Sequence, residues 1–162
     1  MRIRTDGVSP VVAEILLVAI TVVLAAVVYL MASGILTGHT ESVPVVAFAP
    51  GVTFTGGSHN VTLMIGGTSQ NLYPFNYEFN LKVDAAYGVP TQFAASRTAA
   101  NVTIGGTLYR VTWTDADGAG TVTQGDRIDV TGNGVSLPVN TAFEFILLWH
   151  DGTTLTTASW HT

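Results

Sequence analysis

The pattern of apolar and polar residues divides the chain into two parts with different periodicities. In residues 15–32 every residue is apolar apart from Thr21 and the amphipathic Tyr29. No charged residue occurs between Glu14 and His39. About 20 helical residues are enough to cross the hydrocarbon core of a bilayer, so this run predicts a long apolar helix.

The ends of this helix carry recognisable signals. Ser9 can cap the helix, and Pro10 suits the first turn, where its missing N–H costs nothing. Gly34 and Gly38 are typical of helix termination. We therefore expect the helix within residues 8–37.

The rest of the chain has a period of two. Residues 77–84 alternate apolar and polar side chains at every step, as a half-buried strand does. Asp151 and Gly152 predict a hairpin turn. Further strands are expected at residues 60–65, 108–113, 127–130 and 143–149. The expected fold is α+β: a long N-terminal apolar helix followed by an antiparallel β-sandwich or a small β-barrel.

This pattern predicts four segments. They are a leader peptide (1–7), a hydrophobic assembly or transmembrane helix (8–37), a linker with the first strand (38–50) and a globular all-β domain (51–162).

The composition and motifs of the chain give no sign of a nucleic-acid-binding protein or of an enzyme. The 162 residues include no cysteine, and only 10% of them are charged, with a net charge of −5 and no basic cluster, so nucleic acid is not an expected partner. No nucleophile, phosphate-loop or dinucleotide motif is present, and the four histidines lack metal-ligand spacing, so we do not expect an enzyme. Large aromatic residues are expected in the core, with subunit contacts as the alternative: Tyr73, Phe75, Tyr77, Trp113, Trp149 and Trp160.

The apolar segment fits three classes of protein. A secretory signal peptide has a shorter apolar core, although residues 32–34 (Ala-Ser-Gly) could serve as its cleavage site. A membrane anchor would leave the C-terminal part outside the cytoplasm, because Arg2 and Arg4 precede the span. Two further features of the sequence indicate a third class of protein. The basic N-terminal stub ends in Asp6-Gly7, before the apolar run, and Glu14 lies inside the expected helix.

The N-terminal sequence resembles that of archaeal type IV pilins. The resemblance rests on GVSPVVA at residues 7–13 and on ILLVAITVVLAAVV at residues 15–28. It implies that a prepilin peptidase cleaves between Gly7 and Val8 on the cytoplasmic side. It also implies that the helix is held in the membrane until pilus assembly machinery packs it with its copies in a filament core. The expected function is then a structural subunit of an extracellular filament for adhesion or surface attachment. The alternative is a membrane-anchored extracytoplasmic binding domain that does not polymerise.

Glu14 departs from the archaeal pattern, in which an apolar residue is common at this place. A carboxylate in hydrocarbon costs about 2.5–3.5 kcal/mol even on insertion scales, so such residues are usually partnered. We expect Glu14 to pair with a cation or an N-terminal amine during assembly. The alternative is that it lies hydrated at the headgroup level.

Two candidate modification sites have the glycosylation sequon. They are Asn60, in Asn-Val-Thr at residues 60–62, and Asn101, in Asn-Val-Thr at residues 101–103.

Residues 115–126 resemble a calcium loop of the EF-hand and dockerin type. Calcium prefers converging oxygens, and a glycine at the sixth place lets the chain bend round the ion. Here Gly120 takes that place, whereas Ala119 at the fifth offers no side-chain oxygen. No cofactor is required by this interpretation, and the alternative is a metal-free turn. The candidate ligands are Asp115, Asp117, Thr121, Thr123 and Asp126.

Overall fold

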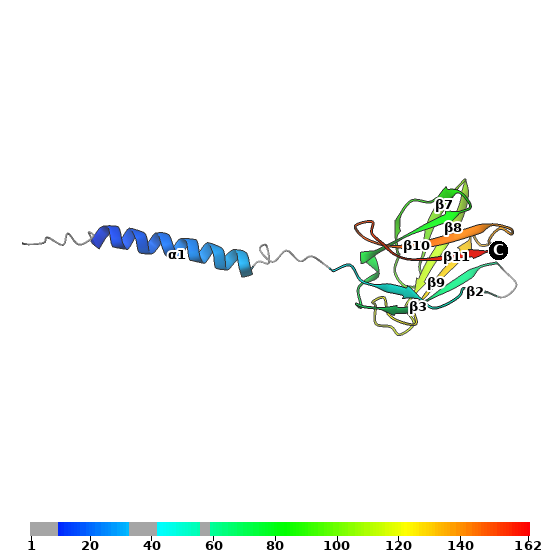
Figure 1. The fold of residues 1–162 in the computed structure, drawn as a ribbon, viewed down its shortest axis with the longest axis horizontal. Helices are drawn as coiled ribbons and strands as arrows, with labels where there is room; N and C mark the ends of the chain where they lie inside the picture. The colour runs from blue at the N-terminus through cyan, green and yellow to red at the C-terminus, as the bar shows by residue number, and fades with distance from the viewer. Residues whose placement is uncertain (1–9, 33–41, 56–58) are drawn as a thin grey trace, which may run out of the picture. The chain divides into compact units, whose positions relative to one another are not determined.

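The computed structural model describes residues 10–32, 42–55 and 59–162. The chain divides into two units, and the division falls between Ser42 and Val43. Figure 1 shows a helix in the first unit and β-strands in the second, which we call the β domain. Each unit is described by itself.

The first unit contains one described helix, α1, from Pro10 to Ala32. It begins at Pro10, as expected from the fixed backbone angle of proline. Its residues 10–29 are all exposed, so this stretch is apolar on every side and the described residues bury none of its side chains. Within the described residues, Pro10–Tyr29 is the one helical stretch long and apolar enough, by length and composition, to cross a membrane. The hydroxyl of Thr21 donates to the carbonyl of Val18 (2.9 Å), which satisfies a polar group in this apolar run.

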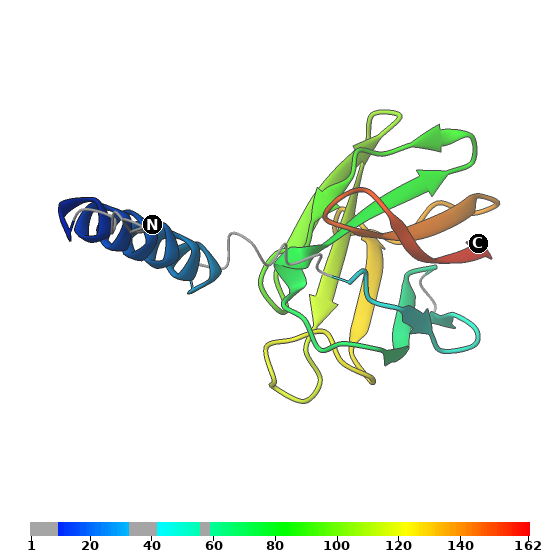
Figure 2. The same cartoon turned by 60° about the vertical axis from the view of Figure 1, so that its left-hand side comes forward.

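The β domain consists of two antiparallel sheets that pack face to face (Figure 2). In the described residues one sheet has the order β1-β3-β9-β8-β7, with β2 against β3, and the other has the order β11-β10-β4-β5, with β6 against β4. The strands of the first sheet are β1 (Val46–Phe48), β2 (Thr53–Phe54), β3 (Val61–Thr68), β7 (Ala99–Ile104), β8 (Thr107–Thr114) and β9 (Arg127–Gly132). Those of the second are β4 (Tyr77–Val83), β5 (Ala86–Tyr87), β6 (Thr91–Gln92), β10 (Ala142–Trp149) and β11 (Thr154–His161).

The α+β fold class is confirmed, and so are the long predicted strands. The two sheets do not close on each other, so the domain is a sandwich and not a barrel. The hairpin predicted at Asp151 and Gly152 joins β10 to β11. The sequence did not predict β7, whose inward side chains are Ala100, Val102 and Ile104.

Aromatic side chains from both sheets form much of the core. Phe145 of β10 contacts Phe48 of β1 edge-on and stacks with Phe79 of β4, at ring-centroid distances of 5.9 Å and 5.8 Å. Tyr77 and Trp149 meet edge-on at 5.5 Å. Fully burying each such ring is worth about 1.5–3 kcal/mol. The contact between Phe48 and Phe145 joins the two sheets, whereas the other two contacts lie within the second sheet.

The core prediction is wrong for two of the six aromatic residues. Tyr77, Trp113, Trp149 and Trp160 are buried, whereas Tyr73 and Phe75 are exposed. The reason is Pro74, which starts the short 3₁₀ helix η1 (Pro74–Asn76) and interrupts the alternation that continues into β4.

Candidate functional site

The helix α1 is the first candidate site, because it exposes apolar side chains along its described length. Its large exposed side chains are mostly valine, leucine and isoleucine, from its first turn onward. Glu14 lies in this surface and is itself exposed, and the side chains around it are Val11, Ile15 and Val18. A carboxylate in such surroundings can stay ionised in water or beside a cation, but not against hydrocarbon alone.

The predicted cleavage site, Gly7 and Val8, lies outside the described residues. The first described residue is Pro10, which begins α1.

The second candidate site is the loop between β8 and β9, which we call the acidic loop (residues 115–126). The two strands pair antiparallel from Thr114 and Arg127 onward, so the loop closes a hairpin. A β-bridge between Leu72 and Val122 joins it to the loop that follows β3, and backbone hydrogen bonds join Gly125 and Asp126 to Ile65 of β3. One carboxylate oxygen from each of Asp115, Asp117 and Asp126 lies within 4.8 Å of the others. The predicted convergence of these three residues is therefore present in the fold.

Asp115 is held by the loop's own backbone. Its two oxygens accept hydrogen bonds from the N–H groups of Gly118 (2.7 Å) and Gly120 (2.8 Å). The hydrogen bond from Gly120 is the main reason that the pKa of the Asp115 carboxyl lies below its ordinary value. Asp115 is therefore ionised at neutral pH, as a metal ligand must be.

Asp117 is exposed, and its two oxygens accept from the Ala119 N–H (2.9 Å) and the Thr123 hydroxyl (3.0 Å). Thr121 is partly exposed in the same loop, whereas Thr123 is buried. Asp117 is thus the most exposed of the three carboxylates.

Asp126 has a different environment, because it is completely buried. Its carboxylate accepts from the Trp113 indole N–H (3.3 Å), the Ala116 N–H (3.0 Å) and the Thr123 N–H (2.9 Å). The Thr123 hydroxyl adds a longer contact of 3.4 Å. These donors replace the water that a buried carboxylate loses, so Asp126 fixes the shape of the loop with or without an ion.

The sequence did not predict two contacts that hold the acidic loop. The Trp113 indole N–H, on β8, donates to the Asp126 carboxylate. The Ser96 hydroxyl, from a distant segment, accepts from the Asp115 N–H (3.0 Å). A tryptophan two residues before an acidic loop is a weak sequence signal, and Ser96 gives none.

The two sequons lie in different environments. Asn101 and Thr103 are both exposed and point outward from β7, an edge strand. Asn60 is half-buried, and its side-chain oxygen is shielded from solvent without a hydrogen-bond partner. The hydroxyl of Thr62 donates to the Asp129 carboxylate. In the folded domain Asn101 is therefore the more accessible of the two.

Comparison with known proteins gives one family match. The model for the N-terminal region of archaeal type IV pilins matches residues 6–48. The match covers α1 and ends in β1, so it leaves most of the β domain unmatched. A search of curated proteins found no match.

Proposed function

We propose that the protein is the subunit of an extracellular filament that attaches cells to surfaces, because residues 6–48 match the model for the N-terminal region of archaeal type IV pilins. The observation that carries the proposal is the helix α1, which exposes apolar side chains in every direction. Such a helix is stable in lipid or among identical helices, but not alone in water.

The two units suit the two stages of a filament subunit. Before assembly, α1 holds the chain in the membrane, with the β domain outside the cytoplasm. On assembly, α1 leaves the lipid and packs against α1 of other copies. Small side chains along α1 allow close approach of helices: Ala13, Ala19, Ala25 and Ala26. Contacts that repeat from copy to copy without closing generate a helical filament.

Two further partners follow from this proposal. A prepilin peptidase removes residues 1–7 by cutting between Gly7 and Val8, and assembly machinery extracts the processed chain from the membrane.

Processing leaves a new amine at Val8. Glu14 lies six residues later, and we propose that it pairs with the Val8 amine of a neighbouring copy, which would offset the cost of placing this carboxylate among apolar helices.

The test uses the full chain produced in cells that process and export it. Shearing should release filaments that are visible by electron microscopy and contain this chain, with Val8 as the first residue by intact mass. A lysine in the middle of α1, Val22→Lys, should abolish the filaments, since a charge there costs about 2.5–3.5 kcal/mol in hydrocarbon. The matched control is Val135→Lys, because Val135 is similarly exposed in the β domain but lies outside the helix.

Two results would contradict the proposal. A chain that stays in the membrane fraction with nothing released by shearing is the behaviour of an anchored binding domain. A first residue near Ile35 would instead identify a conventional signal peptide, with α1 discarded on export.

A further inference from the structure

Four exposed apolar side chains lie on two segments of the β domain, its first residues and the loop that follows β3. We call them the basal surface: Val43, Val45, Tyr73 and Phe75. Val43 is the first residue of the β domain. The Val45 N–H donates to the Ser69 hydroxyl and the Ser69 N–H donates to the Val45 carbonyl, both at 2.9 Å. The loop that carries Tyr73 and Phe75 is therefore fastened at its start to the segment that carries Val43 and Val45.

The two aromatic rings of the basal surface are held in a fixed arrangement. Tyr73 and Phe75 stack on each other at a centroid distance of 5.5 Å and an interplanar angle of 9°. The Phe75 carbonyl accepts from the Gln92 side chain (2.9 Å), and the Asn76 carbonyl accepts from the His150 N–H (3.0 Å). A loop tied on both sides presents its apolar groups without a further loss of conformational entropy, as a contact surface requires.

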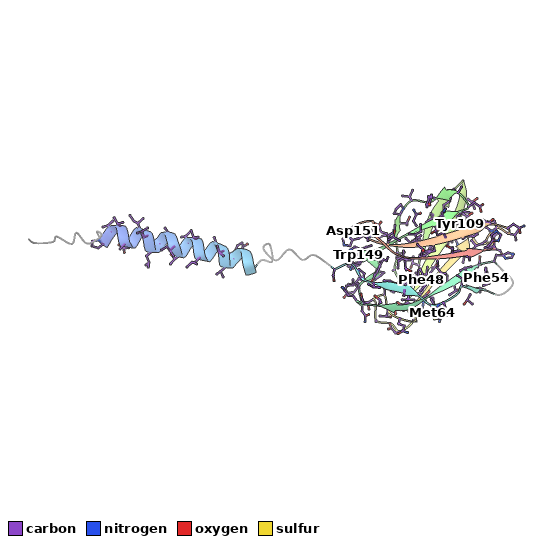
Figure 3. The ribbon with its side chains drawn as sticks, in the orientation of Figure 1. Phe48, Phe54, Met64, Tyr109, Trp149 and Asp151 are labelled. Atoms are coloured by element: carbon purple, nitrogen blue, oxygen red, sulfur yellow. The ribbon has the colours of Figure 1, made fainter. Side chains whose placement is uncertain are left out.

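The basal surface lies at one end of the sandwich. Asn76 is bonded to His150, directly after the end of β10, and Trp149 packs on Tyr77. Figure 3 shows Trp149 and Asp151 at one end of the β domain and Phe54 at the other. The exposed Tyr87 pairs with Lys82, which lies opposite Glu144 near the start of β10, so it is well separated from the basal surface along the strand.

We propose that the basal surface packs against α1 of a second copy of the chain. This inference rests on the filament function proposed above. The four side chains of the basal surface are apolar, and α1 carries one charged residue, Glu14, so most of the helix can cover them without desolvating its own charge. Val43 and Val45 are also the residues of this surface nearest to a helix along the chain, because residues 33–42 join α1 to Val43.

We expect the helix that covers the basal surface to come from a second copy, because polymerisation brings α1 of several copies together. A filament core places α1 of several copies at the end of each β domain from which its own helix is tethered. Tyr and Phe side chains that are exposed on a free subunit are typical anchors of such contacts. On this account the basal surface sets the distance of the β domain from the core.

The experiment uses photocrosslinking in the full chain. A photoreactive phenylalanine analogue replaces Tyr73 in one sample and Tyr87 in the matched control. The two rings have similar exposure, 57% and 61%. Cells produce the labelled chain together with an isotope-labelled wild-type copy, and mass spectrometry identifies the crosslinked peptides. From position 73 we expect crosslinks to residues 10–32 of the other copy, at least about tenfold more than from position 87.

The outcomes separate the inference from the function beneath it. Three results would overturn the inference and leave the filament function standing. They are filaments with no crosslink from position 73 to α1, filaments with a crosslink to the same copy's α1, and filaments with a crosslink to lipid alone. No filaments from the wild-type chain would contradict the function itself. A second measurement uses Tyr73→Ser/Phe75→Ser, which should lower filament yield about tenfold at equal amounts of membrane-held subunit, with Tyr87→Ser within about twofold.

Discussion

The helix α1 and the β domain bury their apolar residues in different ways. In the β domain, Leu81 and Phe145 are fully buried because each strand turns one face toward the opposite sheet. In α1, Leu24 is 57% exposed and Ile15 is 63% exposed, since no described residue of the first unit covers them. The β domain therefore completes its own core, whereas α1 needs lipid or other copies.

This difference has a clear energetic basis. Burying a valine, leucine or isoleucine side chain is worth about 1.5–3 kcal/mol. The exposed side chains of α1 give up that contribution until a partner covers them, and the net stability of a whole domain is only about 5–15 kcal/mol. Covering these side chains, by lipid or by other helices, is therefore favourable for α1 whatever the fold of the β domain.

The largest difference between the two units is expected when α1 is removed. The fragment of residues 43–162 should be folded and monomeric, because its sheets cover each other, and it should form no filaments. Light scattering and circular dichroism measure both properties. Filaments formed by the fragment alone would contradict the assignment of assembly to the helix.

The next test compares a truncation to alanine in each of the two units. Phe145→Ala should lower the free energy of unfolding by about 3–5 kcal/mol, because it removes a buried ring from between the sheets. Leu24→Ala in α1 should change it by less than about 0.5 kcal/mol. Urea unfolding of the full chain in mild detergent, followed by tryptophan fluorescence, gives both values. Equal losses in the two variants would show that α1 packs on the β domain.

A smaller effect is expected at the acidic loop. Asp126→Ala leaves the N–H groups of Trp113, Ala116 and Thr123 without their acceptor, which should cost about 2–3 kcal/mol. Asp117→Ala, at an exposed position, is the control and should cost under about 1 kcal/mol. Urea unfolding of the two variants in calcium-free buffer distinguishes them, and an unchanged Asp126→Ala protein would contradict the structural role of that carboxylate.

Calcium binding stays a prediction, and its expected effect is smaller again. With a Kd of about 1 mM, the weak range of extracellular modules, 10 mM calcium should stabilise the protein by about 1.4 kcal/mol. Thermal melts with and without calcium measure the shift. Asp115→Ala/Asp117→Ala should abolish it, while magnesium at the same concentration serves as the ion control. Identical melts for the wild-type chain would leave a metal-free turn.

The smallest effect on stability is expected at the sequons. In cells that glycosylate exported proteins, Asn101→Gln should lower the intact mass by one glycan, and Asn60→Gln should leave it unchanged, because Asn60 is half-buried. Both substitutions should alter the free energy of unfolding by less than about 1 kcal/mol. A glycan at Asn60 alone would mean that modification precedes folding of the β domain.

The sequence predicted the features that depend on local pattern. Uninterrupted apolar residues predicted α1, and strict alternation predicted β4. The spacing of Asp115, Asp117 and Asp126 predicted that their carboxylates converge. Each of these signals lies within a few residues of chain, where helix and strand periods or turn chemistry decide the outcome.

The features that the sequence did not predict depend on tertiary contacts or on weak propensities. The strand β7 contains two alanines, which have little preference for strands, so pairing with β8 decides its conformation. The exposure of Tyr73 and Phe75 follows from Pro74, a signal that was present but less prominent than the surrounding alternation. The Trp113 indole meets Asp126 only because β8 and β9 pair side by side.

The most direct test of the account is a helical reconstruction of filaments sheared from cells that produce the full chain. The account predicts that residues 10–32 of each copy are buried against the same residues of neighbouring copies, with the β domains outside. Filaments held together by β domains alone, with α1 absent from the density or surrounded by lipid, would contradict it.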